Sequence, residues 1–257
     1  METQKLQVES APASDTKATE PKRLSFKSLT ERLTAPEVEE RRREREAEDA
    51  KRAAWKKQDD LDRALTTLGN RVGDRYADCT LGNFQVTHQQ QGRVADAVRE
   101  YAELLWENLS DGIGVVFYGP VGTGKDHLAH ALAQLATEGG QSVDWVNGQS
   151  WFGKMRDNID ADKSEAAAVA ELVSPQLLVL SDPLPPIGSL TQYQSTMLYR
   201  VIDARYSRKL ATICTVNVKD DTEADERIGA ATWDRLCHGT WKLHCNWPSY
   251  RKPARVV

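Results

Sequence analysis

The 257-residue sequence has no long hydrophobic run and no strong excess of charge of either sign. Its longest apolar stretches, such as IGVVFY and LLVL, are far too short to cross a bilayer, which needs about 20 apolar residues. The first residues, METQKLQVES, contain no apolar core of the kind found in a signal peptide. A cytoplasmic protein is therefore the default expectation.

The small net charge and the small number of cysteines also limit which functions the sequence supports. The net charge of -4 provides no global basic field, so any contact with nucleic acid must come from local basic patches. The chain has four cysteines, and no two of them form a C-x-x-C pair, which leaves zinc and dithiol redox motifs without support. Reduced and mostly buried thiols are expected instead.

The first 111 residues fall into three segments of different composition. Residues 1–35 are small, polar and charged, and they predict a flexible tail because they cannot bury enough apolar surface to become ordered. Residues 36–68 carry many acids and bases and predict a charged helical arm that ends at Gly69. This arm is either a solvated helix or a surface for a protein or nucleic-acid partner. Residues 69–111 predict a linker and a leading helix, with one apolar face formed by Val94, Val98, Tyr101, Leu104, Leu105 and Leu109.

Residues 112–257 alternate short apolar segments with helical patterns. Such alternation predicts an α/β fold with a mostly parallel sheet covered by helices on both faces. The five expected strands are 114–118, 143–147, 177–181, 211–217 and 240–245. The expected helices are 125–138, 149–159, 164–173, 190–208 and 222–236. No C-terminal lid domain is expected, because the chain ends shortly after the fifth strand.

The segment GPVGTGKD, residues 119–126, matches the phosphate-binding pattern G-x-x-x-x-G-K-[ST] except at its last position. Glycines let successive backbone N–H groups point inward, and Lys125 supplies a positive charge for phosphates. An apolar strand before the loop and a helix after it favour a nucleotide site over an ordinary Gly-rich turn. The predicted nucleotide-binding residues are Gly119, Pro120, Val121, Gly122, Thr123, Gly124, Lys125, Asp126 and His127.

Asp126 stands where the pattern has the hydroxyl that binds Mg²⁺. Three interpretations are open at this point: a nucleotide site with an unusual metal shell, a decayed site, and a chance string. A metal role for His127 and His130 is disfavoured, because no third ligand lies at a suitable spacing.

Longer segments resemble one family. GPVGTGKDHLAHALAQLA is similar to the P-loop and following helix of the DnaC/IstB group of AAA+ ATPases, which includes replicative helicase loaders and transposition helper ATPases. RYADCTLGNF resembles the segment that leads into the family's ATPase core, and ERIGAATWDRLCHGTWKLHCNWPSYR resembles its last helix, fifth strand and tail. The resemblance covers about residues 75–252 and leaves out the charged arm. It implies a P-loop NTPase of the AAA+ type that binds ATP and Mg²⁺ and self-associates.

The resemblance also implies roles for individual residues. In LLVLSD, Ser181 replaces the first acid, which helps to hold Mg²⁺, and Asp182 matches the second, which polarises the attacking water. Asn217 in ICTVN matches the sensor beside the γ-phosphate. Arg235 is the first choice for the arginine finger that acts on a neighbouring subunit, and Arg227 is the second.

The metal shell implied in this way contains Asp126, Ser181 and Asp182. Asp126 adds a carboxylate where the family has a hydroxyl, and Ser181 adds a hydroxyl where the family has a carboxylate. The total of one acid and one hydroxyl is thus preserved with the positions exchanged. Arg251, in SYR, matches a family position whose role the residues do not explain. The prolines of the 183–188 loop predict a stiff rim that either reshapes the site or binds a partner.

The leading functional hypothesis is ATP-dependent handling of a replicative helicase on single-stranded DNA during DNA replication, with weak or partner-stimulated ATP hydrolysis. One alternative is an IstB-like helper ATPase that binds duplex DNA and a transposase. Another is a nucleotide-binding scaffold with little hydrolysis, and a further one is an interaction protein that binds no nucleotide.

Overall fold

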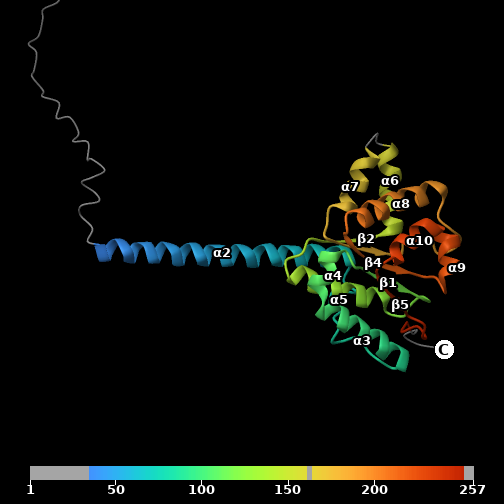
Figure 1. The fold of residues 1–257 in the computed structure, drawn as a ribbon, viewed down its shortest axis with the longest axis horizontal. Coiled ribbons are helices and arrows are strands. Elements are labelled where there is room, and N and C mark those ends of the chain that lie inside the picture. Colours follow the sequence, from blue (N-terminus) through green and yellow to red (C-terminus); the bar gives the residue numbers. More distant parts are fainter. Residues whose placement is uncertain (1–34, 161–163, 252–257) are drawn as a thin grey trace, which may run out of the picture. The chain divides into compact units, whose positions relative to one another are not determined.

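The computed structural model describes residues 35–160 and 164–251 (Figure 1). The expected tail, residues 1–35, lies almost entirely outside this part of the chain. The chain divides into two units between Trp55 and Lys56, and the helix α2, Ala35–Val72, contributes to both. In the first unit α2 is highly exposed, and side chains one turn apart pair along it, as Arg42 does with Glu46 at 3.2 Å.

The end of α2 lies in the second unit, and the predicted end at Gly69 is wrong. The helix continues to Val72, because Leu68 is buried in the core and Arg71 forms an ion pair with Asp144. Gly73 follows with a φ of 88°, a left-handed conformation that favours glycine after a helix, and its N–H donates to the carbonyl of Gly69. Packing on the core therefore extends the helix past its internal glycine.

The leading helix is two helices, α3 (Gln89–Glu103) and α4 (Leu105–Asp111). Leu104 sits at the break between them and is 46% exposed, so its predicted place on the apolar face is wrong. The other apolar positions are buried as expected: Val94, Val98, Tyr101, Leu105 and Leu109.

All five strands of the sheet are parallel, and their order is β2-β3-β4-β1-β5. The three central strands, β3, β4 and β1, are short apolar runs that are almost fully buried, as strands covered on both faces should be, whereas the edge strands β2 and β5 are only partly buried. The strands are β1 Val115–Tyr118, β2 Val143–Asn147, β3 Leu177–Ser181, β4 Ala211–Val216 and β5 Trp241–His244.

Helices cover both faces of the sheet, and alternate strand residues point to opposite layers. Val115 and Phe117 pack in the layer with α3, α4 and α5, whereas Val116 packs in the layer with α6, α7, α8 and α10 (Figure 1). The helices after β1 are α5 Lys125–Glu138, α6 Gly148–Asp160, α7 Glu165–Val173, α8 Gln192–Ser207, α9 Asp221–Ala224 and α10 Ala230–Cys237.

Two of the expected helices differ from the prediction by more than one residue at an end or by an interruption. The helix expected over 222–236 is divided, because a π-helical turn, η1 (Asp225–Gly229), separates α9 from α10. The helix expected over 190–208 begins at Gln192, since Thr191 is its N-cap and accepts a hydrogen bond from the N–H of Gln194. None of the helices in the described ranges is long and apolar enough to span a membrane.

The far end of the sheet from the loop is held together by a buried arginine. Arg205 on α8 is 1% exposed. Its guanidinium donates to Thr212 Oγ1 at 3.0 Å and to the backbone carbonyls of Leu172, Pro175, Gln176 and Ala211. Burial lowers the pKa of Arg205 to about 9, but the five hydrogen bonds retain the charge. One side chain thus links α7, α8, β3 and β4.

The sheet order determines where functional side chains meet. β3, β4 and β1 are neighbours and run in the same direction, so the loops at their carboxyl ends lie together at one edge of the sheet. The glycine-rich segment follows β1, Asp182 follows β3, and Asn217 follows β4.

Candidate functional site: a nucleotide cleft at the strand ends

The loop between β1 and α5 has the geometry of a phosphate cradle. Gly119, Gly122 and Gly124 have φ values of 137°, 77° and 86°, which side chains with a Cβ rarely adopt. A Cβ at Gly122 would collide with Ser249. Thr123 is buried, and its Oγ1 donates to the Pro120 carbonyl at 3.0 Å. The helix α5 begins directly after this loop, at Lys125, and its N-terminal dipole favours an anion there.

Lys125 places a buried charge at the bottom of this loop. The residue is 5% exposed, and its Nζ donates to the carbonyls of Gly119 at 3.0 Å and Pro120 at 2.7 Å. Burial lowers the pKa of its ammonium, while Asp182 and Asp126 act in the opposite direction. A buried cation that is bonded to neutral carbonyls gains stabilisation when an anionic ligand arrives.

Asp126 does face Ser181, and a third residue joins them. Asp126 Oδ1 accepts hydrogen bonds from Ser181 Oγ at 3.0 Å and from Thr215 Oγ1 at 2.7 Å. Ser181 ends β3 and Thr215 lies on β4, in register with each other. The sequence indicated the pair of Asp126 and Ser181, but Thr215 was missed because its contact depends on strand pairing.

Asp182 and Asn217 form a second pair beside the first. Asn217 Nδ2 donates to Asp182 Oδ1 at 2.6 Å. Asp182 has a φ of 43°, a strained conformation for a residue other than glycine, and its N–H donates to the Thr215 carbonyl at 3.0 Å. Burial and, to a smaller extent, the nearby Asp126 raise the pKa of Asp182 to about 6, against the effect of Lys125.

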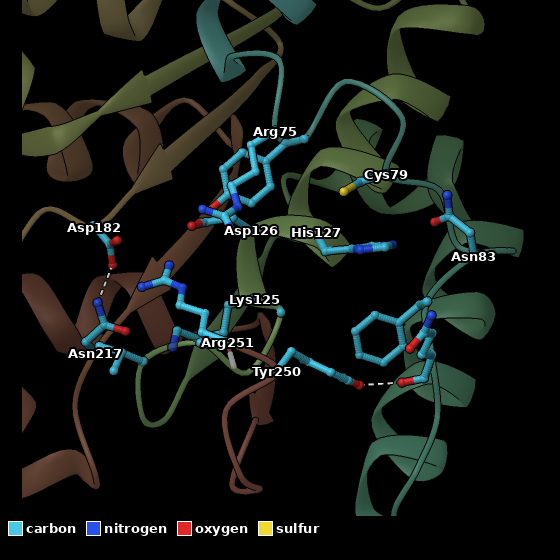
Figure 2. Close-up of a pocket in the computed structure, with 16 residues that line it drawn as sticks. Arg75, Cys79, Asn83, Lys125, Asp126, His127, Asp182, Asn217, Tyr250 and Arg251 are labelled. Carbon is cyan, nitrogen blue, oxygen red and sulfur yellow. Dashed lines mark hydrogen bonds between the residues drawn. The ribbon is translucent and has the colours of Figure 1, made fainter. Parts of the chain in front are cut away.

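A cleft of about 930 Å³ opens over the loop. In the view of Figure 2, Asp182 and Asn217 lie at one end of the cleft and Asn83 at the other. Lys125, Asp126, His127, Tyr250 and Arg251 are seen between these ends. The cleft is large enough for a nucleotide, and its cationic loop lies beside the Asp182–Asn217 end.

Two segments that are far apart in the sequence form the walls of this cleft. Tyr250 donates from its N–H to the Gly122 carbonyl at 2.8 Å and from its hydroxyl to the Gln85 carbonyl. Phe84 packs edge-to-face against Tyr250, with ring centroids 6.0 Å apart. Arg251 lines the cleft and is hydrogen-bonded to Tyr76. The sequence indicated Arg251 without a role, and the contributions of Tyr76, Phe84 and Tyr250 were missed.

His127 has a mainly architectural place in this cleft. Its Nε2 lies 2.8 Å from the Thr80 carbonyl, and its ring packs edge-to-face on Phe84 with centroids 5.3 Å apart. His130, one turn later, lies 3.1 Å from the Cys79 carbonyl through its Nδ1. The two histidines thus tie α5 to the 79–84 segment.

A second cleft, of about 790 Å³, lies on the other side of the loop and shares Asp182 and Asn217 with the first. Val121 is 58% exposed and lines both clefts. Arg227 lines the second cleft, where its guanidinium bonds to residues of its own chain. The structure therefore places Arg227 beside its own Asn217.

Arg235 lies elsewhere, on α10. Its Nε donates to Asp203 at 2.8 Å, and its guanidinium lies 4.9 Å from the centre of the Tyr199 ring. It lines neither of the two clefts described above. Arg235 is thus not brought together with the other predicted catalytic residues of its own chain.

The side-chain oxygens near the loop suit a Mg²⁺ ion that is also bound by phosphate oxygens of a nucleotide. No group of three or more His, Cys, Asp or Glu side chains suited to a metal occurs within residues 35–160 and 164–251. Mg²⁺ prefers hard oxygen ligands, keeps several waters, and commonly uses one or two carboxylates plus substrate phosphates. Asp126, Ser181 and Asp182 offer two carboxylates and a hydroxyl near the loop, which meets that requirement.

The sequence and structure are similar to known ATP-handling proteins. A sequence model of the family described as "IstB-like ATP binding protein" matches residues 75–256. The replicative helicase loader DnaC of Buchnera aphidicola subsp. Acyrthosiphon pisum (strain APS) is 28% identical over 198 residues, which cover 75% of this chain and 76% of that protein. DnaC of Escherichia coli (strain K12) is 29% identical over 189 residues, covering 71% and 74%.

Solved structures agree at the level of the fold. The crystal structure of the DnaC helicase loader has a TM-score of 0.59 at 20% identity and covers 67% of this chain and 99% of that one. The structure of DnaI has a TM-score of 0.54 at 14% identity and covers 70% and 94%. The replication initiator DnaA bound to AMPPCP and single-stranded DNA has a TM-score of 0.55 at 21% identity and covers 67% and 50%. Together with the family match, these likenesses show that the chain belongs to the DnaC/IstB-like AAA+ ATPases, a family of ATP-binding P-loop proteins.

Proposed function

We propose that the chain binds ATP with Mg²⁺ in the cleft over residues 119–126 and uses it to handle a replicative helicase on DNA. The observation that supports nucleotide binding best is the buried Lys125 ammonium. Within the described residues, its hydrogen bonds go only to carbonyls of the loop itself. The relatives that support the helicase assignment are the DnaC loaders, which match this chain over about three quarters of their length.

Each part of the site has a proposed task. The loop N–H groups and Lys125 bind the β- and γ-phosphates. Asp126, Ser181 and Asp182 hold Mg²⁺ directly or through water, and bound Mg²⁺ neutralises charge on the phosphates. Asp182 orients the attacking water, and Asn217, bonded to Asp182, contacts the γ-phosphate and that water. The walls formed by residues 76–85 and 249–251 enclose the rest of the nucleotide.

Hydrolysis in this proposal needs a second copy of the chain. Because Arg235 lies away from its own cleft, it can serve only a neighbouring subunit's nucleotide, where its charge would stabilise the transferring phosphoryl group. Arg235 is therefore the proposed finger, and self-association follows ATP binding.

The test of the nucleotide site is a titration with fluorescent ATP. Lys125→Ala should weaken binding by at least tenfold, since hydrogen bonds to a charged group contribute about 1.5–3 kcal/mol. Lys154→Ala, which removes an exposed lysine of α6, is the matched control and should bind as the wild type does. Equal affinities for all three proteins would exclude this loop as the site.

The test of the partner is capture by the ATP-loaded protein. Recovery of a replicative helicase, dependent on an intact Lys125, supports the loader function. Recovery of a transposase supports the IstB-like alternative, in which the DNA is duplex.

A nucleotide-binding scaffold with little hydrolysis is a second candidate, and one contact favours it. Asp126 already accepts two hydroxyl hydrogen bonds, at 2.7 Å and 3.0 Å, which compete with metal for the same oxygen. ATP binding without turnover, even in the presence of helicase and DNA, would select the scaffold over the ATPase.

A further inference from the structure

The proline-rich loop after β3, residues 183–188, is held at several points. Gln149 Nε2 donates to the Pro183 carbonyl at 2.6 Å. Arg227 donates from Nη2 to the Pro185 carbonyl at 2.8 Å and from Nε to the Gly188 carbonyl at 2.9 Å. Because proline has no backbone N–H and a fixed φ, this loop cannot be held by a regular backbone ladder. Side chains, and Arg227 above all, therefore determine its position.

The same guanidinium also holds the end of β4. Arg227 Nη1 donates to the Asn217 carbonyl at 3.1 Å and to Glu223 Oε1 at 3.1 Å. Asn217 in turn donates from its side chain to Asp182 at 2.6 Å, and Asp182 is the residue directly before the loop. A closed circuit results, which runs from Asp182 along the loop to Arg227, from there to Asn217, and back to Asp182.

The backbone around Arg227 is irregular in a way that supports this arrangement. Arg227 lies in the π-helical turn η1, a rare element that is often found at functional sites. Its carbonyl accepts a hydrogen bond from the N–H of Leu190 at 3.0 Å. Ser195 Oγ donates to the next carbonyl, that of Ile228, at 3.2 Å. Arg227 thus holds the loop with both its side chain and its backbone.

We propose that Arg227 is a positioning residue that acts in its own subunit, where it holds the 183–188 loop against the Asp182–Asn217 pair and so sets how well that pair recognises the γ-phosphate. The inference rests on the proposed nucleotide site. It assigns Arg227 a role different from that of an arginine finger, because four hydrogen bonds engage its guanidinium beside its own Asn217.

The loop also presents a group to the outside. Ile187 is 90% exposed, and it lies between Pro185 and Gly188, whose carbonyls both accept hydrogen bonds from Arg227. The exposed tip of the loop is therefore held from both sides by one side chain, that of Arg227.

The experiment compares affinities for ADP and for a non-hydrolysable ATP analogue in Mg²⁺. Arg227→Ala should leave ADP affinity within about twofold, because the loop and Lys125 are intact, and should reduce the preference for the ATP analogue by about tenfold. Arg227→Lys should fall between wild type and Arg227→Ala, because one ammonium cannot reach three carbonyls at once. Arg200→Ala is the matched control: it removes the ion pair between Arg200 on α8 and Glu165 on α7, and it should keep the wild-type preference.

Hydrogen exchange provides a second readout on the same proteins. The amides of residues 187–190 should exchange faster in Arg227→Ala, and the additional protection that the ATP analogue gives over ADP should disappear. If the loop is freed but the preference for the ATP analogue is unchanged, Arg227 is only structural and the proposal is wrong. A wild-type protein without any preference for the ATP analogue would overturn it as well.

Failure of the proposed function is recognised separately, because the wild type would then bind neither nucleotide. Should Arg227→Ala fail to fold in a thermal melt, Arg227→Lys retains the charge and decides the question. Folded Arg227→Lys could still prefer the ATP analogue over ADP as strongly as the wild type does, with a normally protected loop. The several hydrogen bonds of the guanidinium would then not be required, and the proposal would be rejected.

Discussion

The contact of Asp126 with Ser181 leads to a prediction about exchanged residues. Ser181→Asp alone would place a second carboxylate about 3–4 Å from Asp126. Two like charges 4 Å apart repel by about 4 kcal/mol at an effective dielectric constant of about 20. ATP affinity should therefore fall by at least tenfold even in Mg²⁺, because one metal ion offsets only part of this repulsion.

Asp126→Thr alone removes the acceptor of two hydrogen bonds, from Ser181 at 3.0 Å and Thr215 at 2.7 Å. It also leaves Asp182 as the sole carboxylate of the proposed metal shell, so Mg²⁺-dependent affinity should fall. The double variant restores one acid and one hydroxyl in the order that the family pattern has. It should bind ATP as tightly as the wild type or more tightly.

The assay is a double-mutant cycle on ATP affinity, measured with and without Mg²⁺. We expect a coupling energy above about 1.4 kcal/mol, which corresponds to tenfold in affinity. Asp96→Asn, which removes an exposed carboxylate paired with Arg99, serves as a control that should leave affinity unchanged. If the effects of the two substitutions add to within about 0.5 kcal/mol, Asp126 and Ser181 do not compensate for each other. Asp126 would then be a substitution that impairs the catalytic site.

The remaining predictions concern the finger, the pH dependence and the fold. Arg235→Ala should leave ATP affinity nearly intact and abolish any turnover, while wild-type turnover per molecule should rise with protein concentration; activity that stays constant on dilution to monomer would contradict this. Burial raises the pKa of Asp182 to about 6 in the folded state, so the folded protein binds the proton more tightly and this group lowers stability as pH rises from about 4 through 6. Asp182→Asn should therefore stabilise the metal-free protein above pH 6, by at most about 3 kcal/mol, and not at pH 4; equal differences in melting temperature at both pH values would count against it. Arg205→Met should reduce the free energy of unfolding in urea by about 3–5 kcal/mol, since four buried carbonyls lose a charged donor, whereas Arg208→Met on the exposed end of α8 should have little effect.

Local patterns were sufficient where local forces decide the structure. The strands could be predicted because most of them are short, largely apolar runs, and every predicted strand end agrees with the structure to within one residue. The phosphate loop could be predicted for the same reason, since its glycines and Lys125 act within one segment of the chain. The order of strand, loop and helix around that segment, together with the family resemblance, determined the fold class.

Tertiary contacts decided the points at which prediction went wrong. Gly69 looked like a helix end, but burial of Leu68 and the ion pair of Arg71 with Asp144 carry α2 on to Val72. Leu104 fitted the apolar period, yet the chain breaks there between α3 and α4. At Gly69 the energy of packing on a distant surface thus exceeded a local preference of about 1 kcal/mol.

The sequence by itself determined which residues carry charge and hydroxyl groups at the ends of the strands, among them Asp126, Ser181 and Asp182. Only the tertiary structure decided how these groups are used. It brought Thr215 to Asp126 across 89 residues, closed the cleft with Tyr76 and Arg251 from opposite ends of the domain, and turned Arg227 inward onto its own loop. The physical reason is that periodicity reveals which face of an element is buried, whereas a hydrogen bond between elements depends on strand order and register, which no single segment contains.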